Sequence, residues 1–385
     1  RSSDLLSGRP ELLGFYNDRQ RTLAPLESIW IQLCEKRQHP SECDSQNQLI
    51  LSGYKNAMSQ GVQKNNLGQI EAGYQQAKTF ILGKIMGSYP ANTISQGRAL
   101  WMDRGSIIRS QNEAGLRQNI QNIAKAGFNI IYFETLNAGY PIYPSQLLPQ
   151  NPQIKNWDPL AVAIDEAHKQ NIELHSWVWC FAAGNMRHNK IIGLPDSNEG
   201  PLLQKLAPQN GALQNVNGSH HPAGQPEYWV SPASFETRDF LTSVYQEIVK
   251  NYNVDGLQLD YIRYPFQKNG DWMGFESLAR FESETGINTK EDFIHDEEKL
   301  KTWLAWKAFQ VSSFVRETSL SLKKIKPNLI LSAAVFPLPR ERRMELIQQD
   351  WETWIKNGWI DVLVPMAYSK TPGAIAKLSD YRSEE

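Results

Sequence analysis

Residues 254–265 read VDGLQLDYIRYP, a short apolar run that ends in a carboxylate and an arginine and stops at a proline. Strict alternation places Gln258 and Asp260 on one face of the predicted strand, opposite two leucines. In parallel α/β barrels, catalytic groups follow the carboxyl ends of the strands, where the connecting loops border one cleft. Asp260 is therefore the first candidate catalytic residue. The alternative is an exposed loop with an ordinary Asp–Arg ion pair.

From Arg98 onward, short apolar runs alternate with amphipathic helical segments, a pattern typical of βα units around a parallel sheet. Asp158 and Ser234 are expected to begin two of these helices, and a capping box at Ser110 is expected to begin another. The expected fold is therefore α/β, a TIM (β/α)8-type barrel over residues 93–385. A closed barrel needs eight strands, so the sequence predicts a truncated chain or an incomplete barrel that lacks the last two. The expected strands are residues 99–103, 129–134, 172–179, 254–260, 329–336 and 361–368.

The N-terminal part, residues 1–92, differs in composition from the rest of the chain. It is rich in Gln, Asn, Leu and Lys and has few β-branched runs, which favours a small helical appendage that ends at a break over residues 87–92. The chain begins at Arg1 without a signal-like segment, so we expect the numbering to start after processing or within an expressed fragment. A bridge between Cys34 and Cys43 would suit an oxidising compartment, and the alternative is two unpaired thiols.

Charge and aromatic content narrow the class of partner. The formal net charge is −1, with 40 basic and 41 acidic residues interspersed, so the sequence predicts no basic surface for nucleic acid or for an anionic membrane. No apolar run is long enough for a transmembrane segment. The 12 Trp and 14 Tyr exceed what a core needs, and such rings stack on sugar faces. We therefore expect a polysaccharide partner, with core roles for Trp303, Trp306, Trp351 and Trp354, which sit at helical spacing.

A long polar segment, Phe181–Glu227, interrupts the βα pattern. It is rich in Gly, Pro and Asn and is much longer than an ordinary connection, which indicates a lid or binding loop. The alternative is a disordered insertion, because the segment has few apolar residues. As a lid it would lie over the cleft of Asp260, since it leaves the preceding strand at the end where a barrel forms its active site. It would then offer polar side chains such as Asn185, Arg187 and His188 to sugar hydroxyls.

The second candidate acid is Glu134, which alternation places on the polar face of its strand. Glycoside hydrolysis generally needs two carboxyl groups that flank the scissile bond, and Asp260 with Glu134 is the expected pair. The alternative roles for Glu134 are to bind a substrate hydroxyl or to hold Arg104 or Arg263. The same period-2 argument directs His175, Trp177, Trp179 and Tyr368 toward a shared barrel mouth.

Other chemistries lack their motifs. The sequence contains no glycine-rich phosphate cradle, no His-Glu-x-x-His helix and no Gly-x-Ser-x-Gly elbow. The seven histidines are scattered, so no metal site and no cofactor are expected. His175 is either a general base or a hydrogen-bonded core residue.

Five segments together resemble the glycosyl hydrolase-like 10 family over residues 95–370. Each segment is short, and their combination is what is specific. They are WMDRG at 101–105, NAGYPIYPS at 137–145, ELHSWVW at 173–179, DGLQLDYIRYP at 255–265 and VPMAY at 364–368.

The resemblance implies a TIM-barrel glycosidase with an important aspartate on the fourth strand, which matches Asp260. The family includes bacterial cell-envelope enzymes that cleave peptidoglycan glycan strands stripped of stem peptides, so it implies a periplasmic or extracellular location. The role of Glu134 is inferred from geometry, because its strand departs from the family's pattern. The rival hypothesis is a non-catalytic barrel that binds cell-wall glycan. The expected substrate-binding residues are Asp103, Arg104, Tyr140, His175, Trp177, Trp179, Arg263, Tyr264 and Tyr368.

Overall fold

The chain divides into two compact units, Arg1–Gln96 and Gly97–Glu385. Each unit is described by itself below. The computed structural model describes residues 10–36, 45–87, 97–206, 211–215, 218–222, 224–266, 272–273, 275–290 and 293–368.

The N-terminal unit contains helices α1 (Pro10–Lys36), α2 (Ser45–Gln63) and α3 (Leu67–Gly87). Apolar side chains from all three, among them Leu23 and Met58, form a small core of its own. The expected disulfide rests on Cys43 and on the side chain of Cys34, which lie outside the described residues. None of the described helices is both long and apolar enough to cross a lipid bilayer.

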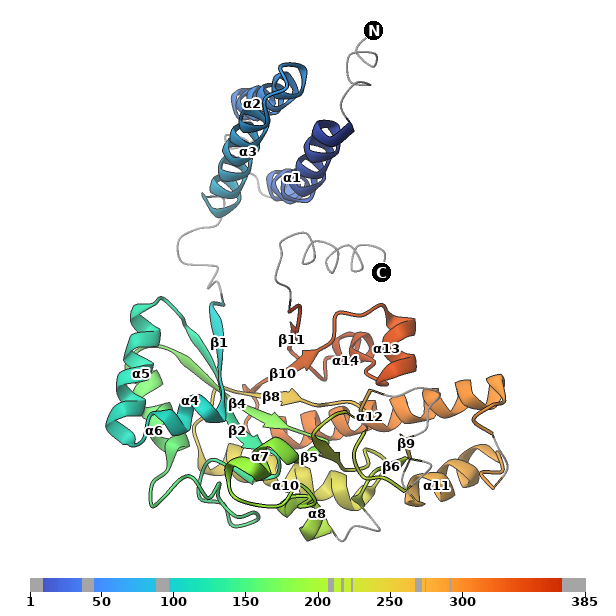
Figure 1. Ribbon diagram of the computed structural model, residues 1–385. Helices are drawn as coiled ribbons and strands as arrows, with labels where there is room; N and C mark the ends of the chain where they lie inside the picture. Colours follow the sequence, from blue (N-terminus) through green and yellow to red (C-terminus); the bar gives the residue numbers. More distant parts are fainter. Residues whose placement is uncertain are drawn as a thin grey trace. The chain divides into compact units, whose positions relative to one another are not determined.

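The second unit is built on a curled parallel sheet (Figure 1). Within the described residues, six strands run parallel in the order β1-β2-β4-β8-β10-β11, and the two-residue β3 (Tyr140–Pro141) pairs antiparallel with β2. Every strand predicted from the alternation is present, and the sheet is a half-barrel of the TIM type. The parallel strands are β1 (Ala99–Met102), β2 (Ile130–Asn137), β4 (Glu173–Trp179), β8 (Gly256–Asp260), β10 (Ile330–Val335) and β11 (Val362–Pro365).

Helices follow the strands and pack against the outside of the sheet. Asp158 and Ser234 cap their helices as predicted, since their side chains accept from backbone N–H groups of the first turn. The capping box at Ser110 is wrong: Asn112 caps the helix, and Ser110 ends the short helix before it. The helices are α4 (Arg104–Arg109), α5 (Glu113–Lys125), α6 (Pro159–Lys169), α10 (Phe235–Asn251), α12 (Glu297–Ile325), α13 (Arg340–Leu346) and α14 (Trp351–Lys356), with α11 (Phe275–Thr285) and β9 (Trp272–Met273) in the β8–α12 connection.

The segment Phe181–Glu227 is folded where it is described, which contradicts a disordered insertion. Leu202, Leu203 and Leu206 are buried in the main core, and Val230 N–H donates to the Phe181 carbonyl (2.9 Å). Its elements are β5 (Ala182–Asn185), α7 (Met186–Ile191), α8 (Pro201–Leu206), β6 (Gln214–Asn215) and β7 (Glu227–Trp229).

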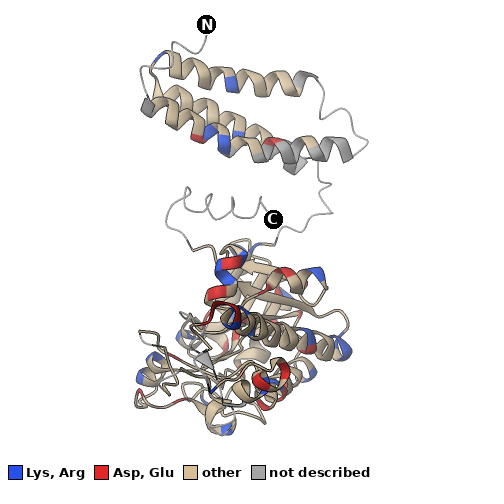
Figure 2. Ribbon diagram, turned by 90° about the vertical axis from the view of Figure 1, so that its right-hand side faces the viewer, with Lys and Arg blue, Asp and Glu red and all other residues tan. Residues whose placement is uncertain are grey.

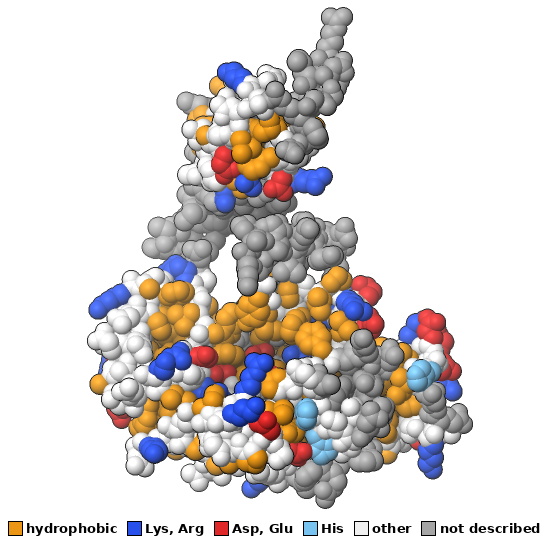
Figure 3. Space-filling model, viewed as in Figure 1, with side chains coloured by type: hydrophobic (Ala, Val, Ile, Leu, Met, Phe, Trp, Pro, Cys, Tyr) orange, Lys and Arg blue, Asp and Glu red, His pale blue; other side chains and the backbone are white. Residues whose placement is uncertain are grey.

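The main core lies between the sheet and its helices. Trp354 is buried in it as predicted, Trp351 packs against it, and Cys180 is a free buried thiol. Trp303 and Trp306 are also buried as predicted, in a separate small cluster with Phe281 and Phe293. In the space-filling view, hydrophobic side chains border the open side of the sheet (Figure 3). In the view of Figure 2, basic and acidic residues of the described part of the second unit are interspersed.

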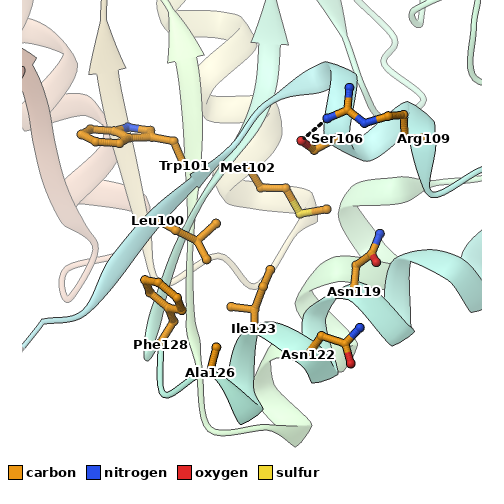
Figure 4. Close-up of a pocket in the computed structure, with 10 residues that line it drawn as sticks. All are labelled: Leu100, Trp101, Met102, Ser106, Arg109, Asn119, Asn122, Ile123, Ala126 and Phe128. Atoms are coloured by element: carbon orange, nitrogen blue, oxygen red, sulfur yellow. Dashed lines mark hydrogen bonds between the residues drawn. The ribbon is translucent and has the colours of Figure 1, made fainter. Parts of the chain in front are cut away.

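A groove of about 610 Å³ runs along β1. Leu100 and Met102 point into it toward Ile123, whereas Trp101 points to the other side of the strand (Figure 4). The groove therefore lies on the helix side of β1, away from the inner face that carries the candidate catalytic residues.

Candidate active site

Asp260 ends β8 on the inner face of the sheet and is 7% exposed. Its Oδ2 accepts from the Trp177 indole N–H (3.0 Å), and its Oδ1 accepts from the Tyr261 backbone N–H (2.7 Å). Burial raises the pKa of Asp260, while these two donors and the charge of Arg263 act in the opposite direction. The alternative of an exposed ion-pair loop is wrong.

Tyr261, the next residue, holds a left-handed backbone conformation (φ +50°) that tyrosine rarely adopts. Such backbone strain persists only where the surrounding structure enforces it, and it concentrates at functional sites. The Tyr261 ring packs on Trp179 (4.3 Å between centroids) and on Trp229 (5.6 Å). These contacts hold the residue that donates to Asp260.

Arg263 lies in an aromatic box rather than in a carboxylate pair. Its guanidinium is 5.0–5.2 Å from the ring centroids of four aromatic residues, and its Nη1 donates to the Tyr264 carbonyl (3.0 Å). At 7% exposed it offers little surface to a ligand, so its position favours an electrostatic effect on Asp260 over direct substrate binding. The box consists of Trp229, Tyr261, Phe266 and Phe336.

Glu134 is buried on β2 and is 4% exposed. Its Oε2 accepts from the Arg104 backbone N–H (2.5 Å), and its Oε1 accepts from the Asn137 amide (2.7 Å). Burial raises the pKa of Glu134 to about 7, although both donors and the Arg104 charge oppose the shift. A carboxyl group with this pKa can hold a proton near neutral pH and release it to a leaving oxygen.

The register relates the two carboxyl groups through Trp177. Glu134 is opposite Trp177 on β4, and Trp177 is opposite Gln258, two residues before Asp260. Two strand spacings and two residues of rise set the Cα atoms of Glu134 and Asp260 about 12 Å apart. Each carboxyl group has its own pair of donors, so the two do not share a proton.

The Tyr261 phenol lies within electrostatic reach of both acids. Burial, and then the charges of three carboxylates, raise its pKa above the ordinary value. Its hydroxyl also donates to Glu227 Oε1 (3.4 Å), so the segment 181–227 reaches the residue that follows Asp260. The three carboxylates are Glu227, Asp260 and Glu134.

Most of the predicted substrate-binding residues gather around these acids. Trp177 and Trp179 are partly exposed, and Tyr368, which follows β11, is 79% exposed. Asp103 caps α4 by accepting from Ser106 N–H (2.7 Å), and this cap positions the Arg104 N–H that bonds to Glu134.

Besides Arg263, two predicted substrate-binding residues do not fit that role. Tyr264 is 1% exposed with Lys307 over its ring, so it has no face for a sugar. His175 lies on the inner face as predicted, but it pairs with Gly256, the first residue of β8, and is 2% exposed. Its Nε2 bonds to Glu173 (3.2 Å), and burial lowers its pKa. His175 is therefore a core residue at the opposite end of the strand from Asp260.

Several residues of the site were not predicted. Asn137 carries a signal in retrospect, because β2 extends three residues beyond the predicted end and keeps polar side chains there. Tyr261 and Trp229 carry none, since their positions depend on tertiary contacts. No group of His, Cys, Asp or Glu within the described parts of the chain is arranged to hold a metal ion.

A TIM-type half-barrel whose inner face carries two buried carboxyl groups near aromatic rings is an arrangement typical of glycoside hydrolases. The sequence profile described as Glycosyl hydrolase-like 10 matches residues 96–385. The chain belongs to this family, which confirms the resemblance carried by the five segments.

Known relatives agree with this class. The chain is 22% identical to Glycosyl hydrolase YngK of Bacillus subtilis (strain 168), with 75% of this chain and 58% of the relative covered. It is 21% identical to Glycosyl hydrolase DigH of Escherichia coli (strain K12), with 68% and 59% covered. The chain thus spans less than two thirds of these relatives' length.

A solved structure supports the fold alone. The glycoside hydrolase domain of PgaB (BpsB) from Bordetella bronchiseptica superimposes with a TM-score of 0.55 at 13% identity, and the match covers 75% of this chain and 80% of that domain.

Proposed function

We propose that this protein is a glycoside hydrolase that cleaves an N-acetylated polysaccharide, and that its substrate is the peptide-free glycan strand of peptidoglycan. The observation that carries the proposal is Asp260, a buried carboxylate at the end of β8 with two donors and an aromatic surround. Membership of a glycosyl hydrolase-like family supports the reaction class. The substrate rests on the resemblance, and it implies a cell-envelope location.

In this proposal the two carboxyl groups have different tasks. Both donors of Asp260 suit its ionised form, so Asp260 stabilises the oxocarbenium-like transition state. Glu134, with a pKa of about 7, donates its proton to the leaving glycosidic oxygen. The anomeric carbon is attacked by Asp260, by water or by the substrate's own 2-acetamido oxygen. The anomeric configuration of the first product separates inversion from the two retaining routes.

Sugar binding is assigned to the partly exposed rings near Asp260. Trp177, Trp179 and Tyr368 have accessible faces and lie at or just after strand ends. An indole or phenol ring stacks on the apolar face of a pyranose while its polar edge meets hydroxyl groups.

The test is the release of reducing ends from purified peptide-free glycan strands. Wild-type protein should release them, and the Asp260→Asn variant should not. If neither protein releases reducing ends from any N-acetylated glycan while the wild type still binds the strands by calorimetry, the non-catalytic glycan-binding barrel replaces this proposal.

A further inference from the structure

Glu134 and Asn137 meet on one side of β2 although they are three residues apart, since the Asn137 amide donates to Glu134. In a regular strand an odd spacing would place the two side chains on opposite faces. The register with β4 explains the difference, because it shifts by one residue between Glu134 and Leu136, which makes Thr135 an extra residue in β2. Bulges of this kind bend a strand and redirect side chains next to active sites. The bulge therefore brings Asn137 to the same side as Glu134.

The β2–β3 hairpin fixes the backbone of Asn137. Asn137 pairs with Tyr140 across a turn of two left-handed residues, Ala138 (φ +50°) and Gly139 (φ +78°). This turn geometry matches the twist of paired strands. A side-chain carbon at Gly139 would lie 2.7 Å from the Ala183 carbonyl oxygen, so the turn packs closely against β5. Asn137 thus begins a turn that has little room to move.

The Arg104 guanidinium fixes the orientation of the Asn137 amide. Arg104 Nη1 donates to Asn137 Oδ1, and Asn137 Nδ2 donates to Glu134 Oε1 (2.7 Å). The Arg104 backbone N–H completes a ring of hydrogen bonds by donating to Glu134 Oε2 (2.5 Å). A guanidinium has donors and no acceptor, so it holds only the amide orientation in which the oxygen faces Arg104. The NH2 group must then face Glu134.

This orientation decides where a proton on Glu134 can go. A flipped Asn137 amide would present its oxygen to Glu134 and accept that proton. In the observed orientation both carboxyl oxygens accept from N–H groups, so the ring contains no acceptor for the proton. The proton is then left for an acceptor outside the ring, which in the proposed reaction is the leaving glycosidic oxygen.

Arg104 also brings a positive charge that no ion pair within the described residues neutralises. At Glu134 this charge favours ionisation and the charge of Asp103 opposes it, while the Tyr261 phenol after β8 lies within electrostatic reach. Loss of the Arg104 side chain would therefore remove two things at once, the group that orients the amide and a nearby charge. A test has to separate these two effects.

From this ring of hydrogen bonds we propose that Arg104 and Asn137 are positioning residues for the proton donor Glu134. Arg104 acts through Asn137, which it orients so that the amide donates to Glu134 and cannot take its proton. The inference rests on the proposed function, which gives Glu134 that task. It assigns Arg104 a role other than the expected contact with substrate.

The direct test is titration of the Glu134 carboxyl group by ¹³C NMR, on protein labelled at the glutamate side-chain carboxyl carbon. The signal of Glu134 is the one that Glu134→Gln lacks. In Arg104→Met the titration should move to higher pH by about one pH unit or more, and the basic limb of the pH–rate profile should follow. The plateau kcat should fall about tenfold, because the flipped amide holds the proton, while KM stays within about twofold of wild type.

Asn137→Leu separates orientation from charge. Leucine is close to asparagine in size but can neither donate to Glu134 nor accept its proton. The titration should therefore move to higher pH while the plateau kcat stays within about threefold of wild type. The decisive variant combines Arg104→Met with Asn137→Leu. It should regain the plateau rate that Arg104→Met loses, because no amide remains to take the proton, whereas a merely structural role would add the two losses.

Three further variants serve as controls. Arg104→Lys keeps the charge and has only donors, so its titration and rate should stay near those of wild type. Arg104→Gln, whose amide can accept as well as donate, should behave like Arg104→Met and replaces it if that variant does not fold. Arg109→Met is the matched control, because Arg109 is an exposed arginine of the same helix that bonds to Ser106 (2.8 Å). It should leave both readouts unchanged, and circular dichroism reports folding.

The outcomes distinguish the positioning role from the proposed function. An unmoved titration in Arg104→Met, or a double variant no faster than Arg104→Met, would overturn the positioning role and leave the proposed hydrolase standing. If the wild type cleaves no glycan, the proposed function fails and the titration alone decides. A larger upward move for Arg104→Met in the wild-type background than in the Asn137→Leu background then supports the positioning role, and equal moves overturn it.

Discussion

Asp260 and Glu134 are both buried carboxyl groups with two donors each, yet their surroundings differ. Asp260 receives an indole N–H and lies near Arg263, whose charge opposes the effect of burial. Glu134 receives a backbone N–H and an amide, and burial prevails to bring its pKa to about 7. Burial raises the pKa of both acids and an arginine charge opposes the shift in each case, so the different tasks proposed for them rest on the donors and aromatic surroundings of each carboxyl group.

The largest effect is expected when the charge of Asp260 is removed. Asp260→Asn keeps the size and shape of the side chain but removes its negative charge. The new amide NH2 must face either the Trp177 indole N–H or the Tyr261 N–H, so kcat should fall about 10³-fold or more. Rates of reducing-end release and thermal midpoints measure this. Asp255→Asn is the control, because Asp255 bonds to His168 and Leu174 N–H before β8 begins. It should cost stability and leave kcat unchanged; activity of Asp260→Asn within twofold of wild type would remove Asp260 from the mechanism.

The next effect tests Glu134 as the proton donor. Glu134→Gln cannot release a proton, so kcat should fall about 10²-fold to 10³-fold, and the basic limb of the pH–rate profile near pH 7 should disappear. Kinetics between pH 5 and pH 9 provide the measurement. A basic limb that survives unchanged in Glu134→Gln would assign that limb to another group.

The pH dependence of the free energy of unfolding provides a second test of Glu134 and a control for Glu134→Gln. Glu134 stays protonated in the folded state and ionises in the unfolded state, so its contribution is full below about pH 4.5 and is lost by about pH 7, in total about 3 kcal/mol. Glu166 is a buried carboxylate whose pKa is lowered by its hydrogen bond with Gln121, so its contribution is present above pH 4.5 and is lost on acidification. Glu166→Gln should alter the acid side of the stability curve and leave the rate unchanged.

Much of this arrangement could be predicted from sequence. Alternation located every strand of the half-barrel, and it placed Glu134, Trp177 and Asp260 on the inner face. Period-2 alternation gives the face of a side chain but not its depth along the strand, which is why His175 was assigned to the mouth although it lies at the other end.

The remaining errors have local causes. Ser110 and Asn112 are both good capping residues, and Ser110 was already used to end α4. The segment 181–227 folds as elements of two to six residues, too short for any periodicity to reveal them. His188 was expected to offer its side chain to the cleft as part of a lid, but tertiary contacts leave it 1% exposed.

A moderate effect on the pH–rate profile is expected from a substitution of Arg263. This residue is the cation beside Asp260. Arg263→Met removes the charge while a thioether still packs against the four rings, so the pKa of Asp260 should rise. The acidic limb of the pH–rate profile should move to higher pH, so that kcat at a pH on that limb falls about tenfold. Arg280→Met removes a cation that lies over Phe235 (4.1 Å), and it should leave the limb in place. An unmoved limb in Arg263→Met would show that Asp260 is ionised without help from Arg263.

The smallest effect isolates the one hydrogen bond that the indole of Trp177 gives to Asp260. Trp177→Phe keeps an aromatic ring but removes the Nε1–H donor, so kcat should fall about fivefold to tenfold, as for one hydrogen bond of ordinary net strength, while KM stays within about twofold. Trp354→Phe is the matched control, because its indole N–H donates to Ser312 Oγ (2.9 Å) within the helical layer. That variant should lose comparable stability at unchanged kcat. If Trp177→Phe instead raised KM and left kcat unchanged, Trp177 would act as a sugar platform alone, and the environment of Asp260 would depend on Arg263 and the Tyr261 N–H.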